Sequence, residues 1–222
     1  DYIELDVQLT SDGEVIVMHD SNAYRTTGVD ENIANMTYKE VRRLDAGSWY
    51  SVEYKGEKVP GLREVLELAQ GKIKLNIELK PADNSEELAR KTVALIEKYN
   101  MENDCVITSF SSSALSAAKS CDENIRVGYI LSAAYGEYYD MKNIDFFSVN
   151  AAFLSKRTID AIHNSGKQVY AWTVNNKDSI KNLTNKGVDG VITDNPVLAR
   201  ETIYSRDTSE TIINMIRYVF NQ

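Results

Sequence analysis

Short apolar runs alternate with longer amphipathic stretches along almost the whole chain. The short runs are rich in β-branched and aromatic residues, which is typical of β-strands. The stretches between them repeat apolar residues at helical spacing, and glycines such as Gly166 and Gly187 follow them where helices commonly end. The pattern predicts strands at residues 2–8, 15–19, 74–80, 106–109, 126–130, 146–150, 168–174 and 190–193.

The regular exchange of strand and helix predicts repeated βαβ units and therefore a parallel sheet. An open doubly wound sheet is the competing architecture. Against it, no Gly-x-Gly-x-x-Gly loop follows any predicted strand, and polar residues end several different strands rather than one. Such a distribution suits the mouth of a (β/α)8 barrel, so we predict a single α/β barrel domain over residues 1–205.

Two segments depart from this rhythm. Residues 20–73 are long, polar and tyrosine-bearing, and an insertion of this length after a strand is more often functional than not. Residues 206–222 place Ile212, Met215, Ile216 and Val219 at helical spacing, which predicts a C-terminal amphipathic helix.

Charged residues occupy one face of the first predicted strand. Side chains alternate across a strand, so Glu4 and Asp6 share a face and the aliphatic residues between them share the other. The apolar face is expected to pack under helices. Two carboxylates pointing into a barrel are costly unless a cation or hydrogen-bond donors compensate them.

The run at 74–80 has the same pattern. Asn76, Glu78 and Lys80 face one way, while leucine and isoleucine face the other. Together with Glu4 and Asp6, this strand brings three carboxylates and one ammonium to the barrel interior. Three oxygen donors suit a hard divalent cation, Mg²⁺ or Ca²⁺, completed by water and substrate.

A histidine stands at the end of the apolar run 15–19. At this position, on the lip of the predicted mouth, His19 can give or take a proton near neutral pH. His163 lies in a helical stretch and is expected at the surface. Each feature has an ordinary alternative, since acids alternate with aliphatics on exposed edge strands and single histidines are commonly structural. Two charged inward faces in one parallel sheet are not explained by an exposed edge.

Composition narrows the classes of partner. The formal net charge of −8 over 222 residues argues against nucleic acid as the main partner. Two cysteines, Cys105 and Cys121, do not make a disulfide framework. No apolar stretch approaches the roughly 20 residues of a membrane span. The compartment stays open between the cytoplasm and attachment to a membrane through a region upstream of Asp1.

An ordered series of short motifs resembles the glycerophosphodiester phosphodiesterase family over residues 1 to about 200. The motifs occur in the family's order, so chance agreement is negligible. They are Ile3-Glu4-Leu5-Asp6-Val7-Gln8, Thr10-Ser11-Asp12-Gly13, Val17-Met18-His19-Asp20, Arg25-Thr26-Thr27-Gly28, Val59-Pro60-Gly61-Leu62, Asn76-Ile77-Glu78-Leu79-Lys80, Ser109-Phe110, Ala171-Trp172-Thr173-Val174-Asn175 and Gly187-Val188-Asp189-Gly190-Val191-Ile192-Thr193-Asp194.

The resemblance implies a TIM barrel of the phospholipase C-like phosphodiesterase type and a metal-dependent hydrolase that splits glycerophosphodiesters into glycerol 3-phosphate and an alcohol. It also implies roles for individual residues. His19 matches an acid/base histidine, Lys80 a catalytic lysine at the phosphate, and Trp172 an aromatic residue in the substrate pocket. The metal ligands implied are Glu4, Asp6 and Glu78. The resemblance also implies that residues 20–73 are an insertion that caps the barrel mouth.

One departure from the family pattern concerns the start of the barrel. Family members begin with a strand that ends in His-Arg-Gly, and no His-Arg pair occurs in these 222 residues. We therefore expect a barrel without its first β/α unit, with seven barrel strands and the run 15–19 beside the run 2–8. This chain is expected to be nearly inactive. The gap that the missing β/α unit leaves in the barrel is expected to be covered by the tail helix or by a neighbouring chain in a homo-oligomer.

The alternatives keep the fold and change the role. One is a non-catalytic barrel that binds a glycerophosphodiester or a protein partner. The other is a related phosphodiesterase acting on a lysophospholipid or a teichoic-acid-like polymer. The expected partner is a small-molecule glycerophosphodiester, with no nucleic acid and with membrane anchoring only through residues upstream of the chain.

Overall fold

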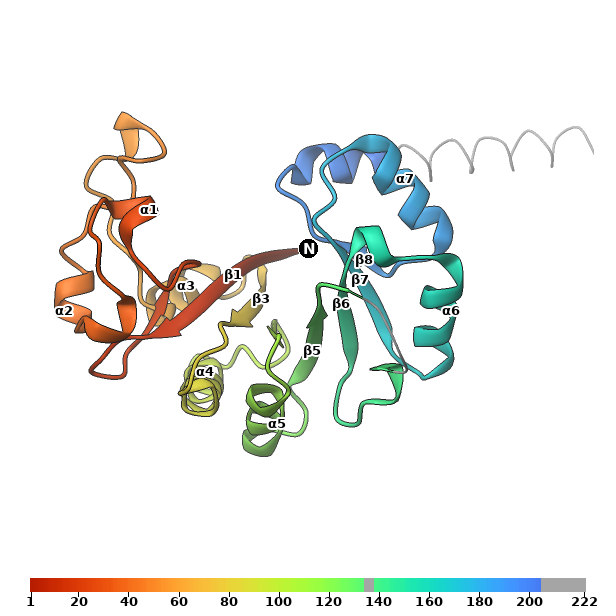
Figure 1. The fold of residues 1–222 in the computed structure, drawn as a ribbon, viewed down its shortest axis with the longest axis horizontal. Coiled ribbons are helices and arrows are strands. Elements are labelled where there is room, and N and C mark those ends of the chain that lie inside the picture. Colours follow the sequence, from red (N-terminus) through yellow and green to blue (C-terminus); the bar gives the residue numbers. More distant parts are fainter. Residues whose placement is uncertain (134–137, 205–222) are drawn as a thin grey trace, which may run out of the picture. The chain divides into compact units, whose positions relative to one another are not determined.

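The computed structural model describes residues 1–133 and 138–204 (Figure 1). The chain divides into two compact units, Asp1–Tyr129 and Ile130–Gln222. The predicted C-terminal helix at 206–222 lies outside the described residues. All the predicted strands are present, with bounds that differ from the prediction by at most a few residues at each end.

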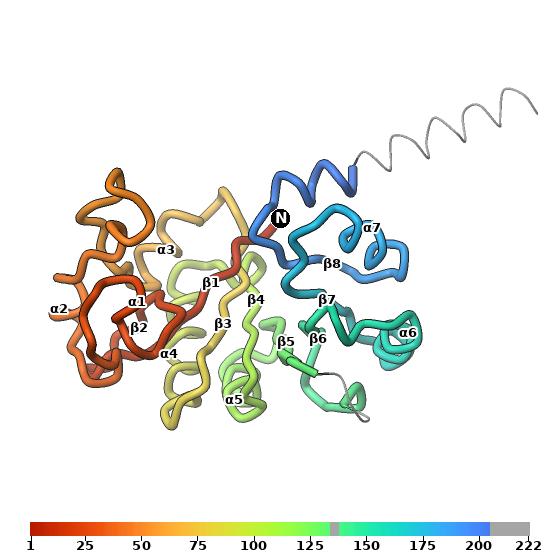
Figure 2. The backbone as a smooth tube through the Cα atoms, turned by 45° about the horizontal axis from the view of Figure 1, so that its top comes forward, coloured from red at the N-terminus to blue at the C-terminus, as the bar shows by residue number. Residues whose placement is uncertain are grey.

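The sheet of the first unit is parallel except for one short strand. Its order is β2-β1-β3-β4-β5, and β1, β3, β4 and β5 run parallel (Figure 2). β2 pairs antiparallel with β1, as the arm of a hairpin, because the turn at residues 10–14 is too short for the crossover that parallel strands need. The strands are β1 (Tyr2–Leu9), β2 (Val15–Val17), β3 (Lys74–Leu79), β4 (Cys105–Ser109) and β5 (Arg126–Leu131).

Helices pack against the outer face of these strands. α4 (Ser85–Lys98) and α5 (Ser112–Cys121) lie against each other and contact β3 and β4, respectively. α4 buries one stripe of aliphatic side chains, including Leu88, Val93 and Ile96. In β1 the predicted alternation is present, with Leu5 and Val7 buried, although Ile3 at the start of the strand is largely exposed.

The second unit continues the βα alternation. β6 (Phe146–Asn150), β7 (Gln168–Trp172) and β8 (Gly190–Val191) are parallel neighbours in that order. The intervening helices are α6 (Lys156–Asn164) and α7 (Lys177–Lys186), and the 3-10 turns are η3 (Tyr138–Asp140) and η4 (Ala151–Phe153). Residues 196–204 are helical. In the parts of the chain that the structure describes, no helix has both the length and the apolar character of a membrane span.

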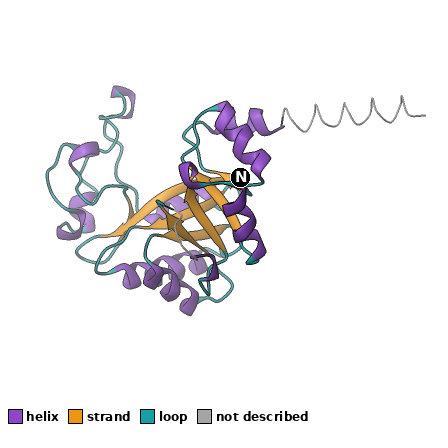
Figure 3. Cartoon of the chain, turned by 45° about the vertical axis from the view of Figure 1, so that its right-hand side comes forward, coloured by secondary structure: helices purple, strands orange, loops and turns teal. Residues whose placement is uncertain are grey.

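Residues 20–73 consist of short elements joined by long loops (Figure 3). Their order is α1 (Tyr24–Thr27), η1 (Ile33–Asn35), α2 (Tyr38–Val41), η2 (Val52–Tyr54) and α3 (Leu62–Ala69). Despite its polar sequence, the segment has a small core that it shares with the end of the β1–β2 hairpin. The buried members of this core are Ile16, Met18, Ala23, Ile33, Met36, Val41, Leu44 and Val59.

The packing of the small core predicts how a substitution within it changes the stability of the protein. Ile33 is 0% exposed within it, so Ile33→Ala leaves a cavity and is expected to lower the free energy of unfolding by about 2–5 kcal/mol. The measurement is the midpoint of urea unfolding, with the dependence of the unfolding free energy on urea concentration expected to stay unchanged. The control is Leu68→Ala on α3, where the side chain is 69% exposed and the expected change is within about 0.5 kcal/mol. Equal effects of the two substitutions would contradict a packed core around Ile33.

Candidate active site

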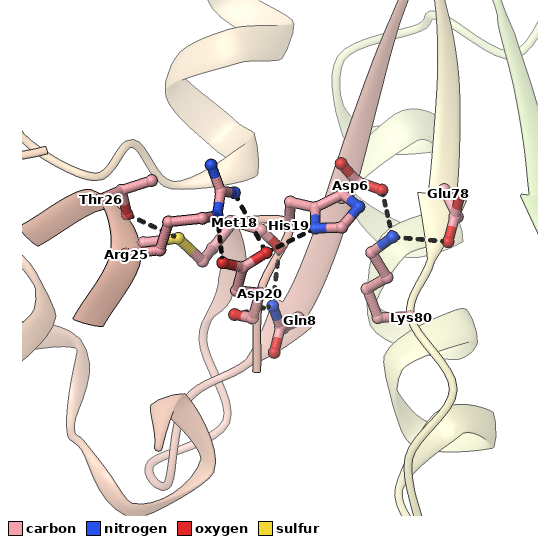
Figure 4. Close-up of polar contacts among 9 residues, drawn as sticks. All are labelled: Asp6, Gln8, Met18, His19, Asp20, Arg25, Thr26, Glu78 and Lys80. Carbon is pink, nitrogen blue, oxygen red and sulfur yellow. Dashed lines mark hydrogen bonds and ion pairs between the residues drawn. The ribbon is translucent and has the colours of Figure 1, made fainter. Parts of the chain in front are cut away.

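The carboxylates predicted from the sequence lie on two adjacent strands. Glu4 and Asp6 are on β1, and the β1–β3 register pairs Glu4 with Asn76 and Asp6 with Glu78. Because paired residues in neighbouring strands point to the same face, this register brings Asp6 and Glu78 side by side (Figure 4). The alternate residues of both strands are aliphatic and, apart from Ile3, buried, so the polar face is set by the strand period.

Three carboxylates converge at this face. One oxygen from each of Glu4, Asp6 and Glu78 lies within 4.8 Å of the other two. A hard cation binds oxygen ligands at about 2.0–2.6 Å, so two of its ligands are at most about 5 Å apart. The three residues therefore fit a Mg²⁺ or Ca²⁺ ion in both donor type and spacing.

Lys80 follows β3 and forms ion pairs with two of the three carboxylates. Its Nζ lies 2.6 Å from Asp6 Oδ1 and 2.8 Å from Glu78 Oε1. Burial by itself lowers the pKa of Lys80, but the hydrogen bonds from its ammonium to Asp6 and Glu78 outweigh burial and raise that pKa. The ammonium is therefore held in its charged form next to the carboxylates.

Glu4 is the one of the three carboxylates that forms no ion pair with Lys80. Partial loss of hydration, followed by repulsion from Asp6 and then from Glu78, raises the pKa of Glu4 to about 7. The pKa of Glu78 is also raised, first by burial. Burial is thus the largest cause of both shifts, and repulsion between the carboxylates adds to it. A bound cation would favour the ionised carboxylates.

The loop after β2 places His19. The strand ends at Val17, two residues earlier than predicted, and Gln8 Nε2 fixes the following backbone by donating to the carbonyl oxygens of Met18 at 2.7 Å and Asp20 at 2.8 Å. The imidazole is 64% exposed. Burial raises the pKa of Glu78 and a charge on His19 opposes this rise slightly, so the ring lies within electrostatic reach of that carboxylate.

Asp20 orients the His19 ring. The distance from His19 Nδ1 to Asp20 Oδ1 is 2.6 Å, and Arg25 binds the same carboxylate from the other side. Hydrogen bonds first from Arg25 and then from His19 lower the pKa of Asp20 to about 2. Because an ionised carboxylate only accepts hydrogen bonds, Nδ1 carries a proton and Nε2 is the nitrogen left for proton transfer.

The structure thus groups Glu4, Asp6, Glu78 and Lys80, with His19 nearby, all in the first unit. Trp172 belongs to the second unit, where it is half-buried and its Nε1 donates to the Ser148 carbonyl oxygen at 3.0 Å. His163, also in the second unit, is exposed as expected.

The partner of His163 is Asp189, whose Oδ2 lies 2.9 Å from His163 Nε2. Sequence reasoning did not identify Gln8, Asp20 and Arg25 as parts of the site. Asp20 was adjacent to His19 and Arg25 stood in a recognised motif, but their contacts depend on the tertiary fold.

Comparisons with known proteins agree with one another. The model of the "Glycerophosphoryl diester phosphodiesterase family" matches residues 1–198. A glycerophosphodiester phosphodiesterase of Caldanaerobacter subterraneus is 31% identical over 227 residues, covering 98% of this chain and 86% of its own length.

Solved structures are similar over most of the chain. A phosphodiesterase of Oleispira antarctica in complex with its product sn-glycerol-3-phosphate is 31% identical, with a TM-score of 0.85 over 91% of this chain and 84% of its own. A glycerophosphodiester phosphodiesterase of Agrobacterium tumefaciens is 28% identical, with a TM-score of 0.77 over 90% of this chain and 86% of its own. These matches confirm the predicted α/β fold class, that of the phosphodiesterase TIM barrels.

Proposed function

Because the chain belongs to the glycerophosphoryl diester phosphodiesterase family, we propose that it hydrolyses small-molecule glycerophosphodiesters to glycerol 3-phosphate and an alcohol by metal-dependent acid–base catalysis. The observation that carries this mechanism is the convergence of Glu4, Asp6 and Glu78 beside Lys80, with His19 in the loop that follows the β1–β2 hairpin. This arrangement unites a cation site, a fixed ammonium and a proton donor.

Glu4, Asp6 and Glu78 are the residues that would hold one Mg²⁺ or Ca²⁺ ion. A cation there would act as a Lewis acid on a phosphoryl oxygen of the substrate. The raised pKa of Glu4, caused first by burial and then by repulsion from Asp6 and Glu78, supports this assignment, since carboxylates in a partly dry site are costly without a counter-charge.

Lys80 supplies a second positive charge at the same place. Its ammonium, anchored by Asp6 and Glu78, is proposed to neutralise a phosphoryl oxygen as negative charge develops in the transition state. Preorganised charge of this kind requires no rearrangement during the reaction.

His19 is proposed to transfer the proton at the leaving oxygen. With Nδ1 bonded to Asp20, Nε2 of the imidazolium donates to the departing alkoxide. The nucleophile, water or a neighbouring glycerol hydroxyl, needs a base of its own. In the family pattern this base is a second histidine, in a His-Arg-Gly motif that does not occur in these 222 residues.

Two further assignments rest on the family correspondence. Trp172 is proposed to line the substrate pocket, and residues 20–73 are proposed to cap the barrel mouth. The small core within that segment supports a cap with a defined shape.

The test of the function is an assay on a protein that carries the His-Arg-Gly strand ahead of Asp1. Glycerophosphocholine and glycerophosphoethanolamine serve as substrates, and glycerol 3-phosphate is the measured product. We expect turnover that is lost with a chelator and restored with Mg²⁺ or Ca²⁺. A protein that binds the cation and turns over no glycerophosphodiester would instead be a binding module.

Lys80 gives a prediction with a matched control on the same strand. Lys80→Met removes the ammonium and is expected to lower kcat by about a hundredfold, in the range found for loss of one transition-state donor. Lys74→Met is the control, because Lys74 at the other end of β3 lies 4.0 Å from Asp104 and away from the carboxylates. A fall in substrate affinity at unchanged kcat would make Lys80 a binding residue only.

A further inference from the structure

Arg25 binds the carboxylate that holds the catalytic histidine. Its Nε lies 2.5 Å from Asp20 Oδ2 and its Nη2 lies 3.1 Å from Asp20 Oδ1, so the guanidinium contacts both oxygens (Figure 4). Asp20 Oδ1 is also the oxygen that binds His19 Nδ1. The three side chains form a continuous series in which each fixes the orientation of the next.

Trp49 fixes the outer end of this series. The guanidinium carbon of Arg25 lies 5.4 Å from the centroid of the Trp49 ring, within the range of a cation–π contact. The ring is itself tied down, because Trp49 Nε1 donates to the Ala46 carbonyl oxygen at 2.8 Å. Arg25 is thus held on one side by Asp20 and on the other by an aromatic residue of the 20–73 segment.

We propose that Arg25 is a positioning residue for catalysis, which fixes the Asp20 carboxylate and, through it, the ring orientation and the Nδ1-protonated form of His19. The proposal rests on the proposed role of His19. With the imidazole 64% exposed, the ring needs a fixed partner to present Nε2 in one direction. A carboxylate held at both oxygens is such a partner.

A structural role alone does not account for this geometry. The backbone around His19 is already held by Gln8, which binds the carbonyl oxygens of Met18 and Asp20. Arg25 is 52% exposed, and an exposed ion pair contributes little to stability. Loss of Arg25 should therefore release the Asp20 and His19 side chains while the loop keeps its conformation.

Nitrogen-15 NMR of the histidine rings tests this directly in the chain as it stands. The two histidines give two sets of ring signals, and His163, held by Asp189 in the second unit, is the internal reference. We expect wild-type His19, where neutral, to show a protonated Nδ1 and an unprotonated Nε2. In Arg25→Met both His19 nitrogens should shift toward the average of two exchanging tautomers, with His163 unchanged.

Two further variants test whether the two-point contact of the Arg25 guanidinium with Asp20 matters, or only its positive charge. Arg25→Lys keeps the charge without two-point contact and should restore the wild-type signals only in part. Arg90→Met removes an exposed arginine–carboxylate pair on α4, where Arg90 Nη2 lies 3.5 Å from Glu86, and should change neither histidine. Wild-type His19 signals in Arg25→Met would overturn the proposal.

Kinetics provide the second readout, in a protein with the His-Arg-Gly strand. Arg25→Met should lower kcat by about 10–100-fold, the usual effect of removing a residue that orients a functional side chain by a hydrogen bond. KM should change by about twofold or less. Arg25→Met combined with Asp20→Asn should be no slower than Asp20→Asn alone, because both act through one carboxylate. Multiplicative losses would overturn the proposal.

The two readouts also separate this proposal from the role of His19. Full activity of a His19→Gln variant would refute the catalytic role, while the NMR result would still decide whether Arg25 holds the ring.

Discussion

Replacing His19 with glutamine is expected to lower kcat for glycerophosphodiester hydrolysis by about 10²–10⁴-fold, the usual contribution of a general acid. Glutamine keeps a hydrogen-bonding group of similar size but cannot transfer a proton near neutral pH. The loss should appear in kcat with KM nearly unchanged, because the proton is needed at the leaving oxygen only in the transition state.

The control for this experiment is His163→Gln. His163 is paired with Asp189 and is expected to leave turnover unchanged. A substrate with an acidic leaving group, such as a p-nitrophenyl ester, needs little protonation and should rescue much of the loss. An equal loss on both substrates would show that His19 acts in some way other than proton donation.

Replacing Glu4 with glutamine is expected to reduce cation-dependent turnover to near background, a loss of about 10³-fold or more, in line with the several kcal/mol that a Lewis-acidic ion contributes. Glu4 is the informative ligand to remove because Lys80 pairs with Asp6 and Glu78. Glu4→Gln therefore weakens the cation site and leaves the Lys80 ion pairs in place.

Thermal unfolding gives a readout that is independent of activity. A saturating cation at about 100 times its dissociation constant stabilises the native state by about 2.7 kcal/mol, so Mg²⁺ or Ca²⁺ should raise the Tm of the wild type and much less that of Glu4→Gln. Without cation, Glu4→Gln should be at least as stable as wild type, since it removes one of three mutually repelling carboxylates. If the cation raised the Tm of Glu4→Gln as much as that of the wild type, Glu4 would not be a ligand. Glu86→Gln on α4 is the surface control.

Periodicity predicted the strands and polar faces because both follow from the alternation of side chains along a strand. It placed Glu4 and Asp6 on one face of β1 and Glu78 on the matching face of β3. The register that puts Asp6 beside Glu78 was not predictable, because it is set by how helices and strands pack together. The end of β2 at Val17 likewise depends on the hydrogen bonds that Gln8 makes to the next residues.

The 20–73 segment shows where sequence patterns stop being informative. Its helices have three to eight residues, too few turns for a period to be recognised, and its buried residues are scattered among polar ones. The contact between Arg25 and Trp49 joins residues far apart along this segment. Such pairs depend on loop conformation rather than on a repeat.

The β1–β2 hairpin imposes a constraint on how this protein can vary in evolution. Val7 pairs with Val17 and Leu9 with Val15, so Asp6 and His19 are separated by a short, continuous ladder. Insertion or deletion of one residue within either arm would reverse the faces of all the residues beyond it. Natural variants should therefore keep the length of both arms between positions 7 and 17 and change length only in the turn at 10–14. Selection thus has to preserve the length of the two arms as well as their buried side chains.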